Sequence, residues 1–120
     1  MFTNSFKNRY TFEQREADAI RVLSKYPDRV PIICERSNSA NNIDCPIINK
    51  NKYLVSKDMT MGQFMYVIRR KLRIPPEKGM FLFVNDYIIS VSQMVGDVYD
   101  YYKHSDGFLY VSYGFENTFG

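Results

Sequence analysis

The spacing of apolar residues in the segment 52–72 predicts a short strand followed by a helix. Residues 52–55 (KYLV) are rich in aromatic and β-branched side chains, which favour a strand. Thr60 stands three residues before Gln63, and this capping-box pattern predicts a helix from Thr60 to about Leu72. Within that helix, apolar residues recur at spacings of four, three and four, so one core-facing stripe contains Met61, Met65, Ile68 and Leu72.

Phe64 and Val67 lie on a neighbouring stripe of the same helix, beside Lys71. An apolar patch next to a cation is typical of a ligand groove on the surface. A wide core face that includes both side chains explains the same pattern, and periodicity alone favours this second interpretation. Both interpretations stay open at this point.

Two helices are predicted ahead of the first strand. The first ten residues mix aromatic and polar side chains and fit a short helix. Thr11 and Gln14 form a second capping box, which predicts a helix from Phe12 to about Lys25 that Pro27 must end. The residues expected on its apolar face are Phe12, Ala19, Ile20 and Leu23.

Four strands are expected in total. The first, Val30–Glu35, is followed by the polar loop 37–42 and pairs with residues 52–55 as a hairpin. The continuous apolar run Phe81–Val84 is typical of a strand buried on both faces. Leu109–Tyr113 is the last strand.

A turn and a short helix connect the last two strands. Asn85 and Asp86 form a turn into a brief extended segment, 87–89, and Ser90 and Gln93 repeat the capping pattern ahead of a short helix. The order of elements is therefore two helices, two strands, a helix, a strand, a short helix and a strand. This order predicts an α+β domain with mixed strand pairing.

Length and composition fit one globular domain. A chain of 120 residues, 45% hydrophobic and 16% aromatic, buries a core without metal or disulfide staples. No apolar run approaches the roughly 20 residues that span a bilayer, and the first ten residues lack the apolar centre of a signal peptide. We therefore expect a cytoplasmic protein. The two cysteines, Cys34 and Cys45, are expected to be structural thiols, with no metal site and no cofactor.

The net charge of +3 is distributed unevenly along the chain. Residues 50–78 contain eight Lys or Arg against two acidic residues, whereas residues 79–120 contain one Lys against five acidic residues. An acidic partner is therefore expected to bind the part formed by 50–78. A solvated helix face is the alternative explanation.

Enzyme motifs are not found in the sequence. His104, the only histidine, lies in a polar stretch that reads as a turn, and there is no nucleophile elbow, phosphate-binding glycine loop or distinct pair of carboxylates. The prediction is therefore that the protein is not an enzyme. Nucleic-acid binding is disfavoured because the total charge is modest, and a binding module fits better.

Several segments together resemble the autophagy-related ubiquitin-like modifiers, in particular the branch of the GABA-receptor-associated protein. The resemblance runs in family order from about Phe12 to Gly120. It rests on the segments Lys25–Pro31, Lys52–Val55, Met59-Thr60, Gly62–Phe64, Phe83–Asn85, Asp106–Tyr110 and Phe119-Gly120. It implies a ubiquitin-like β-grasp fold, with a four-stranded mixed sheet and two additional N-terminal helices. The implied divisions are a helical extension at 1–26, a β-grasp core at 29–113 and a flexible tail at 114–120.

The resemblance also implies a function in which Gly120 is conjugated to a lipid. An E1-like enzyme activates the glycine with ATP, an E2-like enzyme carries it as a thioester, and phosphatidylethanolamine on the autophagosome membrane receives it. A deconjugating cysteine protease acts on the same family. The protein is therefore expected to be a substrate of these enzymes, located in the cytoplasm and, when lipidated, on the autophagosome membrane.

A second implied role is recognition of cargo receptors and adaptors through peptides with an aromatic residue and, three positions later, an aliphatic one. Such a peptide adds a strand beside residues 52–55 and places two side chains in pockets. The implied aromatic pocket consists of Asp18, Val22, Pro31, Lys52, Leu54 and Phe108. The implied aliphatic pocket consists of Tyr53, Val55, Met59, Phe64 and Val67. A basic rim that attracts acidic flanks consists of Arg29, Lys50 and Lys71.

Two rival functions stay open beside this one. A trafficking or microtubule-associated adaptor would keep the peptide groove without conjugation. A nucleic-acid binder would use the basic residues of 50–78 and would show steeply salt-dependent binding.

Overall fold

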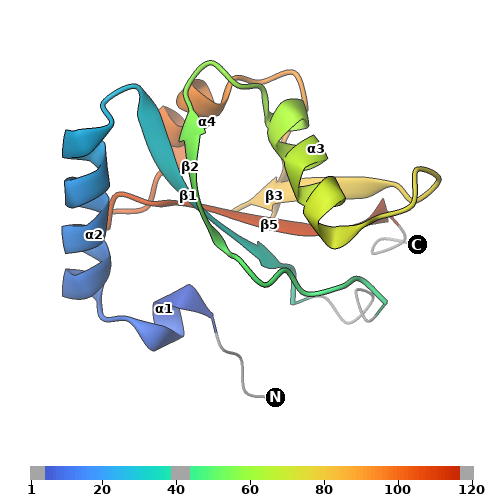
Figure 1. Cartoon of the computed structure of the whole chain (residues 1–120), viewed down its shortest axis with the longest axis horizontal. Coiled ribbons are helices and arrows are strands. Elements are labelled where there is room, and N and C mark those ends of the chain that lie inside the picture. Colours follow the sequence, from blue (N-terminus) through green and yellow to red (C-terminus); the bar gives the residue numbers. More distant parts are fainter. Residues whose placement is uncertain (1–4, 39–43, 117–120) are drawn as a thin grey trace.

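The computed structural model describes residues 5–38 and 44–116, and Figure 1 shows a central sheet with helices on both sides of it. The predicted α+β class and the ubiquitin-like fold are confirmed, with two helices ahead of the first strand. The elements are α1 (Phe6–Arg9), α2 (Phe12–Lys25), β1 (Arg29–Arg36), β2 (Lys52–Ser56), α3 (Met61–Leu72), β3 (Met80–Val84), β4 (Tyr87–Ile88), α4 (Val95–Tyr102) and β5 (Leu109–Phe115).

The sheet has five strands in the order β2-β1-β5-β3-β4, so the prediction of four strands was wrong. β1 and β5 are parallel neighbours, and the other pairs are antiparallel. The additional strand, β4, has only two residues and pairs with the end of β3. Asn85 and Asp86 join these strands with φ angles of 51° and 67°, as a tight two-residue hairpin turn requires. The predicted turn at these residues is confirmed, and the strand after it was too short to recognise from its pattern.

The last strand is longer than predicted. β5 continues through Phe115, because Gly114 pairs with Phe81 and Phe115 pairs with Met80. The predicted boundary between core and tail, at residue 114, was therefore two residues early. The part of the predicted tail at residues 117–120 lies outside the described residues.

Two of the three capping patterns mark helix starts. Thr11 caps α2 and Thr60 caps α3, each with the reciprocal bond from a glutamine three residues later. Ser90 and Gln93 are also hydrogen-bonded, through the Ser90 N–H and the Gln93 side-chain oxygen at 3.2 Å. They do not begin a helix, because α4 starts at Val95 after Met94, which makes no side-chain cap.

Two apolar clusters cover the two faces of the sheet. The larger cluster joins α3 and α4 to β1, β3 and β5, through Met61, Phe64, Ile68, Val95, Val98, Val30, Ile32, Leu82, Val84, Leu109, Val111 and Tyr113. The smaller one joins α1 and α2 to the opposite face, through Phe6, Ala19, Ile33 and Phe108. Phe64 is only 1% exposed, so the interpretation that α3 has a wide core face is confirmed for this residue.

The predicted apolar face of α2 was partly wrong. Ile20 is 58% exposed, whereas Arg15 and Ala19 are buried against the sheet. Gly107 explains the closeness of this packing, because a Cβ there would lie 2.8 Å from the Ala19 Cβ, and its φ of 94° also favours glycine. The face of α2 that meets the sheet is therefore centred on Arg15 and Ala19.

Both cysteines are unbridged and buried, as expected of structural thiols. Desolvation by burial raises the pKa of the Cys34 thiol, which keeps it protonated at neutral pH. No group of three or more potential metal ligands is present within residues 5–38 and 44–116. Among the helices that the structure describes, none has the length and apolar character needed to cross a membrane.

The burial of Phe64 predicts a large loss of stability in Phe64→Ala. Removing the ring deletes an edge-on contact with Tyr53 (centroids 5.7 Å apart) and leaves a cavity, so the free energy of unfolding should fall by about 3–5 kcal/mol. Urea denaturation measures this change. Tyr66→Ala, on the same helix but at a residue that is 61% exposed, is the control and should change stability by no more than about 0.5 kcal/mol. Equal stabilities of the two variants would show that Phe64 is not a core residue.

Candidate functional site

β2 forms one edge of the sheet and lies between α2 and α3 (Figure 1). It pairs with β1, where Leu54 is opposite Pro31 and Lys52 is opposite Ile33. In the described chain no strand pairs with its other side, so the backbone groups there can receive an added strand. β4, at the opposite edge, offers only two residues. The edge of β2 is therefore the better place for an extended peptide to continue the sheet.

Alternation along β2 sends its side chains to both faces of the sheet. Lys52 and Leu54 lie on the face covered by α2, whereas Tyr53 and Val55 lie on the face covered by α3. Tyr53 and Val55 are buried, Leu54 is half-buried and Lys52 is exposed. One short strand thus contributes to two separate surfaces.

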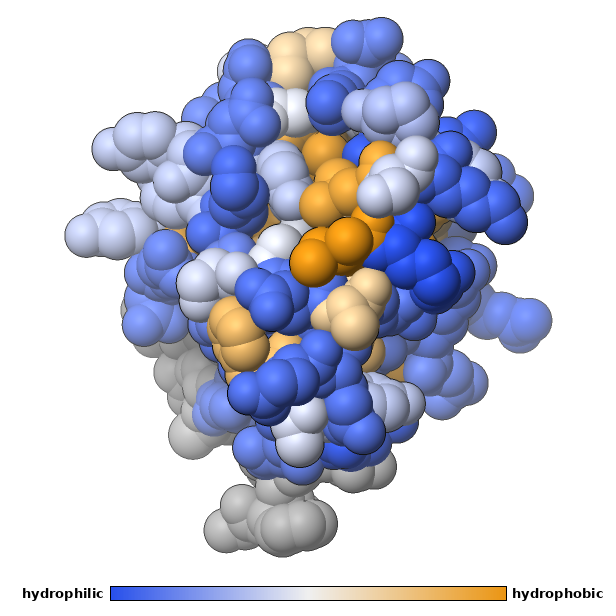
Figure 2. Space-filling model, turned by 90° about the vertical axis from the view of Figure 1, so that its left-hand side faces the viewer, coloured by the Kyte–Doolittle hydropathy of each residue, from blue (hydrophilic) through white to orange (hydrophobic). Residues whose placement is uncertain are grey.

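The residues expected to form the aromatic pocket lie together on the α2 face. Asp18 and Val22 come from α2, Pro31 from β1, Lys52 and Leu54 from β2, and Phe108 from the segment before β5. Pro31 and Phe108 are buried, whereas Val22 and Leu54 are half-buried. Figure 2 faces α2 and shows a small cluster of apolar side chains within a mainly hydrophilic surface.

An ion pair connects α2 to β2 across this set of residues. The Lys52 ammonium donates to the Asp18 carboxylate at 2.7 Å, and Arg21 donates to the other Asp18 oxygen at 2.5 Å. Burial alone would raise the pKa of Asp18, but the hydrogen bonds from Lys52 and Arg21 outweigh it and lower the pKa. Asp18 is therefore ionised at neutral pH and holds Lys52 beside the apolar residues.

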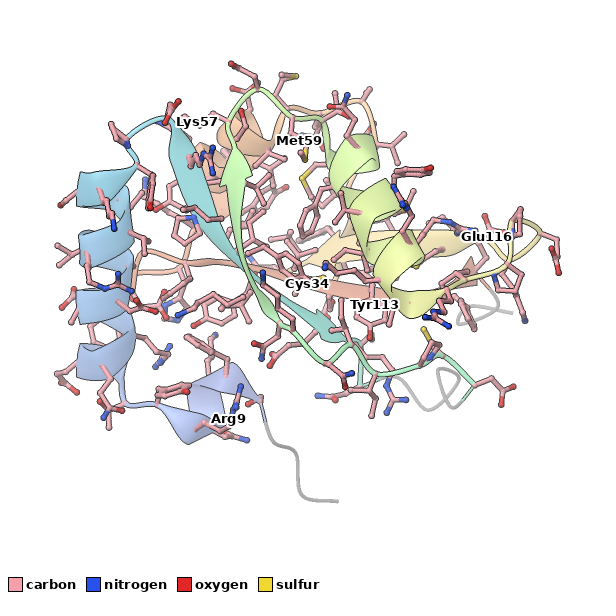
Figure 3. The ribbon with its side chains drawn as sticks, in the orientation of Figure 1. Arg9, Cys34, Lys57, Met59, Tyr113 and Glu116 are labelled. Carbon is pink, nitrogen blue, oxygen red and sulfur yellow. The ribbon has the colours of Figure 1, made fainter. Side chains whose placement is uncertain are left out.

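The residues expected to form the aliphatic pocket lie on the α3 face. Met59 is located between the end of β2 and the start of α3 (Figure 3), and Val67 is half-buried on α3. Tyr53, Val55 and Phe64 are buried in the larger core, so they can only form the floor of such a pocket. A shallow hollow of about 360 Å³ adjoins this set and is lined by Tyr66, Val67, Arg70 and Lys71.

The predicted basic rim is exposed. Arg29, Lys50 and Lys71 are accessible at the surface, and Lys50 lies over the Tyr53 ring, 5.4 Å from its centroid. Lys71 lines the hollow beside Val67. Gly120, the expected conjugation site, lies outside the described residues.

Sequence reasoning missed a buried polar cluster that holds α2 on the sheet. Arg15 donates to the Asp106 carboxylate at 2.6 Å, and Tyr110 donates to the same oxygen at 2.6 Å. The Phe108 N–H donates to the second oxygen of Asp106 at 2.9 Å. The available signal was the position of Arg15, three residues after Phe12 and four before Ala19, which puts a charged residue on the apolar face.

His104 is part of the same turn as Asp106. Its Nδ1 accepts a hydrogen bond from the Asp106 N–H at 3.0 Å, and the chain bends back so that the His104 N–H reaches the Phe108 carbonyl. Both contacts are local, so they give this histidine a role in shaping the turn that leads into β5.

Comparisons with known proteins agree on one family. The family model described as "Autophagy protein Atg8 ubiquitin like" matches residues 14–120. Autophagy-related protein 8 of Mycosarcoma maydis is 49% identical over 117 residues, covering 98% of this chain and 97% of the relative. Autophagy-related protein 8 of Candida glabrata is 47% identical with the same coverage. The crystal structure of Trypanosoma brucei ATG8 superposes with a TM-score of 0.88 at 39% identity, covering 99% of this chain and 100% of the other.

The ion pair between Asp18 and Lys52 predicts a pH-dependent loss of stability in Asp18→Asn. Because the folded state lowers the pKa of Asp18, the charged carboxylate stabilises the fold above its ordinary pKa of about 4, and this contribution disappears as the pH falls through the lowered value. Asp18→Asn should therefore cost about 0.5–1 kcal/mol at pH 7 and less at about pH 3.

Urea denaturation at both pH values measures this difference. Asp28→Asn is the control, since Asp28 is exposed and is in none of the ion pairs among the described residues. A loss of unfolding free energy in Asp18→Asn that is equal at the two pH values would contradict the role of the charge.

Proposed function

This chain belongs to the Atg8 family of ubiquitin-like autophagy proteins, and we propose that it is a modifier that is conjugated through Gly120 to phosphatidylethanolamine and recruits partners through the edge of β2. The observation that carries the second half of the proposal is the arrangement around β2. Two groups of apolar and basic side chains lie on opposite faces of a strand whose outer edge has no partner in the described chain.

Strand geometry connects this arrangement to a peptide motif. Successive side chains of an extended peptide point to opposite faces, so residues three positions apart also lie on opposite faces. An aromatic side chain beside α2 and an aliphatic one beside α3 must therefore be an odd number of residues apart in the peptide. A spacing of three residues meets this condition. Cargo receptors and adaptors with an aromatic-x-x-aliphatic motif fit this requirement.

The charges around β2 support the same class of partner. Lys52 is 47% exposed at its side chain and already pairs with one carboxylate, that of Asp18. Arg29, Lys50 and Lys71 add exposed positive charge near the two ends of β2 and beside Val67. Acidic residues that flank the motif would be steered to this surface and would compete with Asp18 for Lys52.

Family membership and simple chemistry support the proposal of conjugation through Gly120. The glycine carboxylate attacks ATP to form an acyl adenylate and release pyrophosphate, and a thiolate of the E1-like enzyme then displaces AMP. A thiolate of the E2-like enzyme takes over the acyl group and frees the E1-like thiol. The amine of phosphatidylethanolamine displaces this last thiolate to form an amide. Glycine has no Cβ to hinder these attacks. The lipid then supplies the anchor on the autophagosome membrane, a cysteine protease can release it, and the unconjugated protein is cytoplasmic.

A second candidate function keeps the peptide groove without conjugation, as in a trafficking or microtubule-associated adaptor. It is favoured by the fact that every residue named for the groove precedes Glu116 in the sequence. The two candidates differ only in their dependence on Gly120.

Peptide spacing tests the groove. A peptide with an acidic flank and Trp-x-x-Leu should bind, whereas the matched Trp-x-Leu peptide should bind at least about tenfold more weakly because both side chains then point to one face. The chain contains no tryptophan, so indole emission reports only the peptide. The blue shift should weaken in Leu54→Ala and in Val67→Ala. Equal affinity for the two peptides would rule out an added strand at β2.

Removal of Gly120 tests conjugation. Incubation with the E1-like and E2-like enzymes, ATP and phosphatidylethanolamine vesicles should give a lipidated product with the intact chain and none with the variant that lacks Gly120. Retained binding of the Trp-x-x-Leu peptide by this variant is the control for folding. Membrane puncta that persist in cells without Gly120 would favour the adaptor instead.

A further inference from the structure

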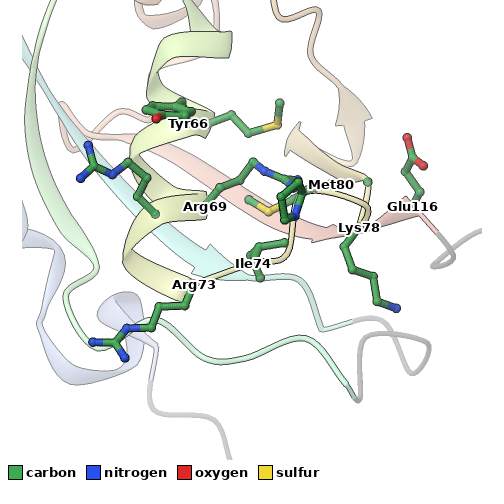
Figure 4. Close-up of a pocket in the computed structure, with 11 residues that line it drawn as sticks. Tyr66, Arg69, Arg73, Ile74, Lys78, Met80 and Glu116 are labelled. Atoms are coloured by element: carbon green, nitrogen blue, oxygen red, sulfur yellow. The ribbon is translucent and has the colours of Figure 1, made fainter.

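A second groove lies beside α3, next to the hollow lined by Val67 and Lys71, and it shares Tyr66 and Arg70 with that hollow. It runs between the second half of α3, the segment 73–80 that leads into β3, and the residue after β5, with a volume of about 580 Å³. Figure 4 shows Arg69 reaching from α3 toward the segment that carries Met80, with Ile74 nearby. Its lining residues include Met65, Arg69, Arg73, Ile74, Lys78 and Met80. We call this surface the α3–β3 groove.

The α3–β3 groove has an apolar floor. Met80 is buried, and Met65 and Ile74 are half-buried at the margin of the larger core. Tyr66 lies at the upper end of the groove in Figure 4 and is 61% exposed. A hollow of this kind can receive one apolar side chain of a partner.

The rim of the groove is strongly basic. Arg69, Arg70, Arg73 and Lys78 line it against a single acidic residue, Glu116. Within residues 5–38 and 44–116, none of these four cations is in an ion pair. Their contacts are instead with neutral groups, since Arg69 donates to the Pro75 carbonyl at 3.0 Å and Lys78 lies 4.9 Å from the centre of the Phe115 ring. The rim therefore presents positive charge that the described part of the chain does not neutralise.

We propose that the α3–β3 groove binds a short acidic peptide segment of a partner protein, with one apolar side chain in the hollow and carboxylates on the basic rim. Charge complementarity selects the acidic segment, and the apolar floor selects the anchor. A concave groove favours a protruding side chain over a flat membrane, which would touch only the rim. Tyr66 and Arg70 line both this groove and the hollow beside Val67, whereas Arg69, Arg73 and Lys78 line this groove alone of the two.

Titration with a defined peptide tests the proposal. The probe is Asp-Glu-Trp-Glu-Asp-Glu, which has an aromatic anchor and no aliphatic residue, and the readouts are indole emission and backbone amide shifts of the isotopically labelled protein. We expect the amide shifts to concentrate at residues 65–80 and 114–116. Shifts that concentrate on α2 and β2 instead would overturn the proposal, because the peptide would then occupy the first groove.

Two variants change the rim in opposite directions. Lys78→Ala combined with Arg73→Gly changes two cations that line this groove and not the hollow beside Val67, and it should weaken binding about tenfold, and less at high salt. Arg73 has a left-handed backbone (φ 57°, ψ 43°), so glycine there should keep or raise the melting temperature while it removes the charge. Glu116→Gln should strengthen binding, because it removes the one acidic residue of the groove. Unchanged affinity in both variants would refute the proposal.

The matched control removes two charges elsewhere. Lys25→Ala combined with Lys103→Ala gives the same net charge as the double variant of the groove, and its affinity should stay within about twofold of the original. An equal loss in the control would show only a general effect of charge and would contradict a site. Vesicles of phosphatidylcholine and phosphatidylserine form a separate arm. Vesicle binding that depends on Arg73 and Lys78, without binding of the peptide, would identify a membrane contact and reject the peptide site.

Discussion

The buried ion pair between Arg15 and Asp106 is the interaction on which the α2 side of the molecule depends. It joins α2 to the turn before β5, and Tyr110 and the Phe108 N–H complete the hydrogen bonds of the carboxylate. Removing one partner of such a pair leaves an uncompensated buried charge, which typically costs about 3–5 kcal/mol. Without this attachment α2 would lose its fixed position over the sheet, and Asp18 and Val22 would no longer face β2.

The edge of β2 gains its two surfaces from the layers around it. A ubiquitin-like sheet covered on one face only would leave the other side of β2 open to water. Here α2 covers the second face, so Leu54 lies beside a helix just as Val55 does. The two helices ahead of β1 therefore convert an ordinary sheet edge into one flanked by apolar groups on both sides. This arrangement is the physical basis for binding two peptide side chains that are an odd number of residues apart.

Local patterns predicted most of the elements, because their signals are local. The capping boxes at Thr11 and Thr60 and the turn at Asn85 depend on neighbours within a few residues. The two-residue strand β4 and the continuation of β5 through Phe115 depend on pairing with β3, which no local pattern contains. The prediction that Ile20 is buried failed because Arg15, satisfied by Asp106, occupies the face of α2 that meets the sheet.

The position of β5 in the sheet has a consequence for how the chain folds. β5 is the last strand of the described chain, yet it lies in the centre, between β1 and β3. The hairpin of β1 and β2 and the hairpin of β3 and β4 can form locally, but they cannot join until residues 109–115 arrive. Until then β1 and β3 each expose a pairing edge, the state in which sheet proteins are most prone to aggregate. Because this step joins distant parts of the chain, closure of the sheet is expected to limit the folding rate.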